Sequence, residues 1–87
     1  MHWKIKIDKD ARKYLLKYNI QDKGREALIK FLKFINGEDI NLDVKRLKGK
    51  FKEYYRIRIG KIRIILRVNF KDKIIFVEMV EKRGDIY

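Results

Sequence analysis

Four arginines occur at alternating positions in two neighbouring stretches of the chain, and this spacing is the strongest chemical signal in the sequence. Arg56 and Arg58 lie in the run YYRIRI, and Arg63 and Arg67 lie in the run IRIILRV. Alternation places residues on one side of a strand, and a guanidinium group donates paired hydrogen bonds to phosphate oxygens. We predict an anion-binding surface with few acidic neighbours, in which a bound anion relieves the repulsion. The alternative is protection of a sheet edge by charge, for which proteins mostly use lysine.

The residue types that are missing exclude several kinds of catalysis. The chain has no Cys, Ser or Thr, and its single histidine is His2. These absences exclude a thiolate or hydroxyl nucleophile, a Ser-His-Asp arrangement and a histidine-based metal site. Glu78 and Glu81 are three residues apart in a strand-like run and are predicted to face opposite ways, so we expect no paired carboxylates, no metal and no cofactor. An enzyme with this composition depends on Arg, Lys, Tyr, Asp and Glu.

Positive charge is concentrated in the second half of the chain. The formal net charge is +12 over 87 residues, and the stretch from Val44 to Arg67 holds ten basic residues against the single acid Glu53. Such a field favours a polyanionic partner, either nucleic acid or an acidic protein, over a merely solvated surface. No apolar run is long enough to span a membrane, so we expect a cytoplasmic protein with no membrane partner. The candidate RNA-binding residues are Arg46, Lys48, Lys50, Lys52, Lys61, Arg67 and Lys82.

Hydrophobic periodicity predicts a single α+β domain over residues 1–87. Alternation at residues 3–7 predicts a strand, and apolar spacing of three and four predicts two helices, the first capped by Asp8 or Asp10 and the second ending before Gly37. We expect residues 19–23 to form a turn, residues 37–49 a polar connection, and the helices an antiparallel hairpin. Strands are predicted at about 53–59, 62–68 and 73–80, joined by short turns. The predicted architecture is a four-stranded, mainly antiparallel sheet with the helical hairpin packed on one face.

The same alternation divides the side chains of the central strands between two faces. We expect Tyr55, Ile57 and Ile59 to face the helices together with the even-numbered apolar residues from Ile62 to Val68. The arginines then face the uncovered side of the sheet. Aromatic and leucine residues at helical spacing are assigned to the core.

The order of the elements and four short motifs resemble the RelE/ParE superfamily of toxins from type II toxin–antitoxin systems. The motifs are RLKG at residues 46–49, YRIRIG at 55–60, IR at 62–63 and EKRGDIY at 81–87. The chain is most similar to the archaeal-type RelE branch. This resemblance implies a β-α-α-β-β-β fold and a ribosome-dependent endoribonuclease that cleaves messenger RNA in the A site. It also implies a cognate antitoxin similar to RelB.

The resemblance assigns roles to five residues as catalytic candidates. Arg56 and Arg58 match two basic strand residues that hold the RNA backbone and the developing charge, and Arg63 matches an arginine that stabilises the transition state. Arg83 matches a basic residue near the leaving oxygen. Tyr87 matches a tyrosine that takes the proton from the 2′-hydroxyl group.

Two other functions remain compatible with the sequence. A ParE-like inhibitor of DNA gyrase shares the fold, and fold does not determine function. A noncatalytic RNA-binding or ribosomal protein is also often strongly basic. The combination of the clustered arginines with Tyr87 favours the ribonuclease, because neither alternative requires it.

Overall fold

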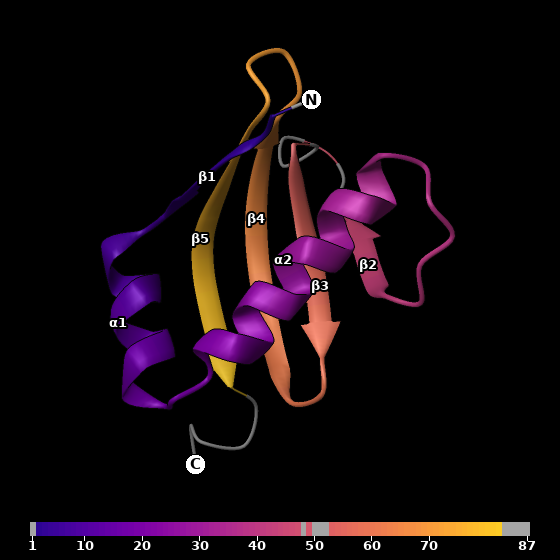
Figure 1. Ribbon diagram of the computed structural model, residues 1–87. Helices are drawn as coiled ribbons and strands as arrows, with labels where there is room; N and C mark the ends of the chain where they lie inside the picture. Colours follow the sequence, from indigo (N-terminus) through magenta and orange to yellow (C-terminus); the bar gives the residue numbers. More distant parts are fainter. Residues whose placement is uncertain (1, 48, 50–52, 83–87) are drawn as a thin grey trace.

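The structure is a computed structural model that describes residues 2–47, 49 and 53–82. It has two helices packed on one face of a five-stranded mixed sheet whose strand order is β1-β5-β4-β3-β2 (Figure 1). This confirms the α+β class. The elements in chain order are β1 (Lys4–Ile7), α1 (Lys9–Lys17), α2 (Gln21–Ile35), β2 (Asp43–Arg46), β3 (Tyr54–Ile59), β4 (Ile62–Asn69) and β5 (Ile74–Lys82).

The sheet has one strand more than the four that the sequence predicts. The additional strand β2 lies in the segment expected to be a polar connection, and it pairs antiparallel with β3. The strand shows little alternation of apolar and polar residues, because only Val44 is apolar among the four residues Asp43–Arg46. At the opposite edge β1 pairs parallel with β5, whereas the remaining neighbours are antiparallel. Charged side chains on the short edge strand β2 protect it from pairing with other chains.

The two helices differ in the residues that cap their first turns. Asp8 caps α1, because its carboxylate accepts hydrogen bonds from the backbone N–H groups of Asp10 and Ala11 at 3.0 and 3.3 Å. Helix α2 begins at Gln21, so the predicted turn at 19–23 is three residues too long at its end. Its N-cap, Ile20, makes no side-chain cap hydrogen bond, so the start carries no sequence signal. Neither described helix is long and apolar enough to cross a membrane.

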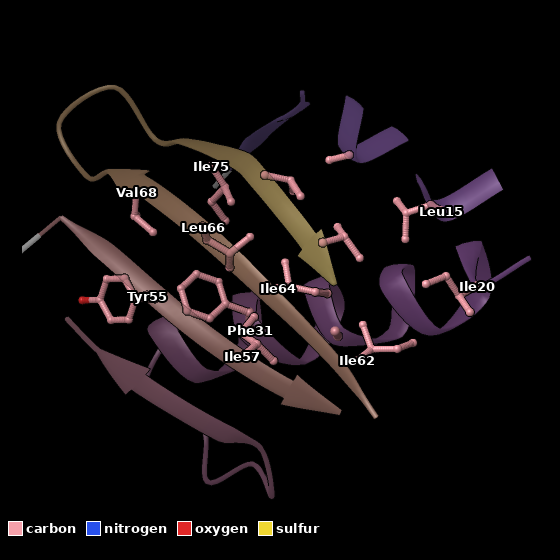
Figure 2. Packing of buried hydrophobic residues seen from close by; sticks show 14 residues of the cluster. Leu15, Ile20, Phe31, Tyr55, Ile57, Ile62, Ile64, Leu66, Val68 and Ile75 are labelled. Carbon is pink, nitrogen blue, oxygen red and sulfur yellow. The ribbon is translucent and has the colours of Figure 1, made fainter. Parts of the chain in front are cut away.

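The core lies between the helices and the sheet. Figure 1 shows α2 crossing β4 and β3 obliquely, with α1 beside β5. The predicted inward residues of β3 and β4 are buried, apart from Ile59, which is half-buried. Figure 2 shows Phe31 of α2 among these side chains, and its ring centre lies 5.4 Å from that of Tyr55. Burying a side chain of this size contributes about 2–3 kcal/mol, which fixes α2 on β3.

A two-residue turn sets the register that the functional face depends on. Gly60 has φ +59° and, with Lys61, connects β3 to β4 so that Ile59 lies opposite Ile62. Positive φ is unfavourable for residues with a Cβ, which explains the glycine. The register then places Arg58 directly opposite Arg63.

Candidate nucleic-acid interface

The sheet has an open face, defined here as the face that does not contact the helices. Arg56, Arg58, Arg63 and Arg67 all lie on this face, because their neighbours in β3 and β4 are buried on the other side. The prediction that these arginines share a face is therefore confirmed. Alternate residues of a pleated strand point to the same face, so two adjacent strands are enough to bring the four arginines together.

The prediction that the arginines have few acidic neighbours is wrong. Arg56 Nη2 donates to Asp43 Oδ1 at 3.3 Å, and Arg67 Nε donates to Glu78 Oε1 at 3.0 Å. Arg63 donates from Nε and Nη2 to a single oxygen, Glu81 Oε2, at 3.2 and 2.5 Å. These carboxylates offset part of the positive charge on the open face.

A β-bulge explains why both glutamates of β5 reach the arginines. The register joins Ile65 to Met79 but Leu66 to Val77, so Glu78 is an extra residue without a partner on β4. An extra residue reverses the alternation beyond it. Glu78 and Glu81 therefore lie on the same face, and the prediction that they face opposite ways is wrong. The bulge is indicated by the buried residues Val77 and Val80, which are three positions apart instead of the two expected in a regular strand.

A cross-strand row, defined as Asp43, Arg58, Arg63 and Glu81, runs over the open face from β2 to β5. The two arginines at its centre are directly opposite each other, an arrangement that destabilises a sheet when no anion joins them. Glu81 pairs with Arg63, whereas exposed Arg58 has no ion pair with any described residue. A phosphate between the two guanidinium groups can accept hydrogen bonds from both.

Arg56 lies beside this row, and its side chain is held more tightly than that of Arg58. Its side chain is 16% exposed, and its Nε is buried without a hydrogen-bond partner among the described residues. Buried donors in folded proteins are nearly always paired with protein or water.

Arg67 lies farther along β4, in a different environment. Its guanidinium carbon lies 4.1 Å from the centre of the Phe76 ring, and Glu78 raises the pKa of Arg67 by hydrogen bonding to it. The two side chains border a hollow of about 220 Å³ that Lys6 and Glu78 also line. Stacking and pairing fix the position of Arg67 more firmly than that of Arg58.

The other predicted RNA-binding residues do not all share the open face. Arg46 and Lys82 lie on the helix side, where Arg46 is opposite the buried Tyr55 and the Lys82 ammonium lies 5.9 Å from the Tyr18 ring centre. Lys61 is exposed in the turn between β3 and β4. The predicted residues outside the described part of the chain are Lys48, Lys50, Lys52, Arg83 and Tyr87.

Within residues 2–47, 49 and 53–82, no group of three or more His, Asp or Glu side chains is placed to hold a metal ion. The acids that pair with the open-face arginines, Asp43, Glu78 and Glu81, were not among the site residues predicted from the sequence. The signal for Asp43 was weak, because it is the first residue of a four-residue strand with one apolar residue.

Comparison with known proteins identifies archaeal relatives. The chain is 34% identical over 89 residues to a Methanocaldococcus jannaschii protein that bears the name toxin RelE1, covering 95% of this chain and 97% of that protein. It is 44% identical over 46 residues to Toxin RelE3 of the same organism, covering 53% of this chain and 50% of that protein. No family model matches the chain.

Solved structures share the fold over nearly the whole chain. The archaeal RelE–RelB complex from Pyrococcus horikoshii contains a chain with a TM-score of 0.65 and 29% identity, covering 98% of this chain and 99% of that one. The RelB–RelE complex from Methanococcus jannaschii gives 0.61 and 29%, covering 94% of each chain. Since a relative above 30% identity is matched over almost its full length, and archaeal RelE structures share the architecture, the chain belongs to the RelE family of toxins of toxin–antitoxin systems.

Proposed function

We propose that this chain is the toxin of a toxin–antitoxin module and acts in the cytoplasm as a ribosome-dependent endoribonuclease that cleaves messenger RNA in the A site and inhibits translation. The observation that carries the proposal is the close pair formed by Arg58 and Arg63 on adjacent strands, with Arg56 beside it. Membership of the RelE family supports the toxin role.

The arginines suit RNA cleavage because of the charge that develops in the reaction. The 2′-oxygen loses its proton and attacks the adjacent phosphorus, and the 5′-oxygen leaves, so a pentavalent state with additional negative charge lies between reactant and product. Preorganised donors stabilise such a state, and losing one typically costs about 3 kcal/mol. Arg56 and Arg58 hold the phosphate, and Arg63 stabilises the developing charge.

The two remaining catalytic candidates, Arg83 and Tyr87, directly follow β5 in the sequence. Arginine remains protonated in proteins, so Arg83 acts as a charge stabiliser and not as a proton donor. A phenol can exchange a proton with the reacting oxygens, which is the role proposed for Tyr87. The reaction as proposed requires no metal.

The proposed partner is a RelB-like antitoxin. The archaeal neighbours at 29% identity are RelE–RelB complexes. An acidic, partly disordered segment that folds on binding complements a basic surface. We expect it to cover or rearrange the open face, where Arg58 lacks an ion pair with any described residue.

Inducible expression followed by mapping of message 5′ ends, with and without ribosomes, tests the proposed activity. The expected result is cleavage confined to translated regions. Growth arrest with intact messages and damaged gyrase would instead support the ParE-like function, and RNA binding without cleavage would support a noncatalytic protein.

Two variants connect the activity to the open face. Arg58→Ala is expected to lower cleavage on programmed ribosomes by about 100-fold, the effect of losing one preorganised donor. Arg25→Ala is the matched control, because Arg25 is an exposed arginine on α2, in the helical layer. Equal cleavage by the two variants would contradict a role for the open face.

A further inference from the structure

The Arg63–Glu81 ion pair brings a carboxylate into the centre of the proposed cleavage surface. Both guanidinium nitrogens that contact Glu81 donate to Oε2, and no described residue donates a hydrogen bond to its second oxygen, Oε1. The side chains are 46% exposed for Arg63 and 32% exposed for Glu81, so an RNA strand can reach both. A guanidinium group that can bind phosphate and a carboxylate that can accept a proton thus lie side by side on the open face.

The charges around Glu81 favour this arrangement. Arg63 lies opposite it on β4, and Arg58 lies one strand farther along the cross-strand row, on β3. On its own strand Met79 shares the open face, whereas the ammonium group of Lys82 lies near the Tyr18 ring on the helix side. The described cations that face Glu81 are therefore the two arginines proposed to bind the scissile phosphate.

We infer that Glu81 is the general base that accepts the proton of the attacking 2′-hydroxyl group. This inference rests on the proposed ribonuclease function and reassigns to Glu81 the proton transfer that the RelE resemblance assigns to Tyr87. A phosphate seated on Arg58 and Arg63 lies next to the carboxylate, because Arg63 contacts both. A carboxylate in an ion pair is already deprotonated, whereas a phenol, with an ordinary pKa of about 10, must first be ionised to act as a base.

The step balances without an additional reactant. The proton moves from the 2′-oxygen to Glu81, the 2′-oxygen forms a bond to phosphorus, and the bond from phosphorus to the 5′-oxygen breaks. The products are a 2′,3′-cyclic phosphate and a 5′-hydroxyl end. The leaving 5′-oxygen takes a proton from water or from the phenol of Tyr87.

Glu78 is the natural comparison, since it is also a glutamate of β5 paired with an open-face arginine. Its partner Arg67 is stacked on Phe76, four residues along β4 from Arg63. Four strand residues span roughly 13 Å, so the arginine that holds Glu78 lies about that far along β4 from Arg63. The bulge brings both glutamates to the open face, but only Glu81 lies in the cross-strand row.

Single-turnover cleavage on programmed ribosomes, measured together with ribosome binding, tests the inference. Glu81→Gln is expected to slow cleavage on the order of 10²–10³-fold with unchanged binding, the usual effect of losing a general base. Glu78→Gln should slow cleavage far less than Glu81→Gln. Glu26→Gln, which removes an ion-paired carboxylate on α2, is the control for stability and expression.

Chemical rescue separates a proton acceptor from a structural counter-ion. Added formate is expected to restore part of the cleavage by Glu81→Ala but none of that by Arg58→Ala, because a small carboxylate can replace a base and not a guanidinium group. If Glu81→Gln cleaves as fast as the wild type or faster, Glu81 is only a counter-ion and the inference fails while the proposed function stands. If the wild type cleaves no RNA, the proposed function itself fails.

Discussion

At the scale of single residues, the open face depends on the geometry of arginine more than on its charge. The Arg63 and Arg67 side chains are 46% and 36% exposed in their ion pairs, and exposed pairs contribute at most about 1 kcal/mol to stability. Their main effect is to hold planar donors in position. Arg58 lacks such a pair among the described residues, and its exposed side chain can reach a phosphate on the open face.

Arg63→Lys tests whether geometry or charge matters. Lysine keeps the positive charge but loses the planar pair of donors, so we expect cleavage to fall by about 10- to 100-fold. Single-turnover rates measure the loss, and thermal denaturation should show little change. Arg25→Lys serves as the control on the helical layer, and an unchanged rate for Arg63→Lys would show that charge is sufficient.

Tyr87→Phe tests the phenol at the end of the chain. Removing one hydroxyl group eliminates proton transfer by this residue, so we expect cleavage to fall on the order of 10²-fold or more. The measurement is the same single-turnover assay, with Tyr54→Phe as a comparison on β3. Cleavage at the wild-type rate would remove Tyr87 from the mechanism.

At the scale of elements, the packing of α2 against α1 requires a small residue. A Cβ atom at Gly24 would lie 3.1 Å from Leu15 Cδ2, and Leu15 is itself buried in the core. The glycine thus allows α2 to approach α1 closely. The position of α2 in turn fixes Phe31 over β3, whose other side carries Arg56 and Arg58.

Gly24→Val should therefore destabilise the protein although glycine is a poor helix former. Overpacking costs about 1–3 kcal/mol, which exceeds the small gain in helix propensity. Chemical denaturation measures the change in the free energy of unfolding. Lys23→Val introduces the same side chain at an exposed site on α2 and should have a smaller effect, and equal losses would show that contact with Leu15 is unimportant.

At the scale of the whole molecule, the fold separates two surfaces. The helices cover one face of the sheet (Figure 1), and the arginines of β3 and β4 lie on the other face. The net charge of +12 attracts polyanions over a long range, and among the described residues the open face is where two arginines lie opposite each other. The net charge thus favours the approach of a polyanion, and the opposed arginines offer it a place to bind.

Salt dependence distinguishes these two contributions. Each phosphate contact to a single strand contributes about −0.7 to the slope of log affinity against log salt concentration. We expect Arg58→Ala to reduce the magnitude of that slope by about this amount, as measured by RNA binding at several salt concentrations. Arg25→Ala lowers the net charge equally and should leave the slope near that of the wild type. Equal slopes for both variants would indicate a diffuse electrostatic interaction.

The sequence by itself determined the two helices, the three long strands, the inward and outward faces of β3 and β4, and therefore the shared face of the arginines. These features follow from local periodicity and from the two-residue turn at Gly60, which are readable along the chain. The resemblance to RelE toxins was also present in local motifs and was confirmed by the relatives.

Only the tertiary structure decided which acids accompany the arginines. Strand β2 is too short to show a clear alternation, and its position next to β3 brings Asp43 to Arg56. The bulge at Glu78 depends on how β5 pairs with β4, and it turns Glu78 and Glu81 to one face. Pairing between distant strands is a non-local property, so the carboxylate beside Arg63 could be found only once the sheet was assembled.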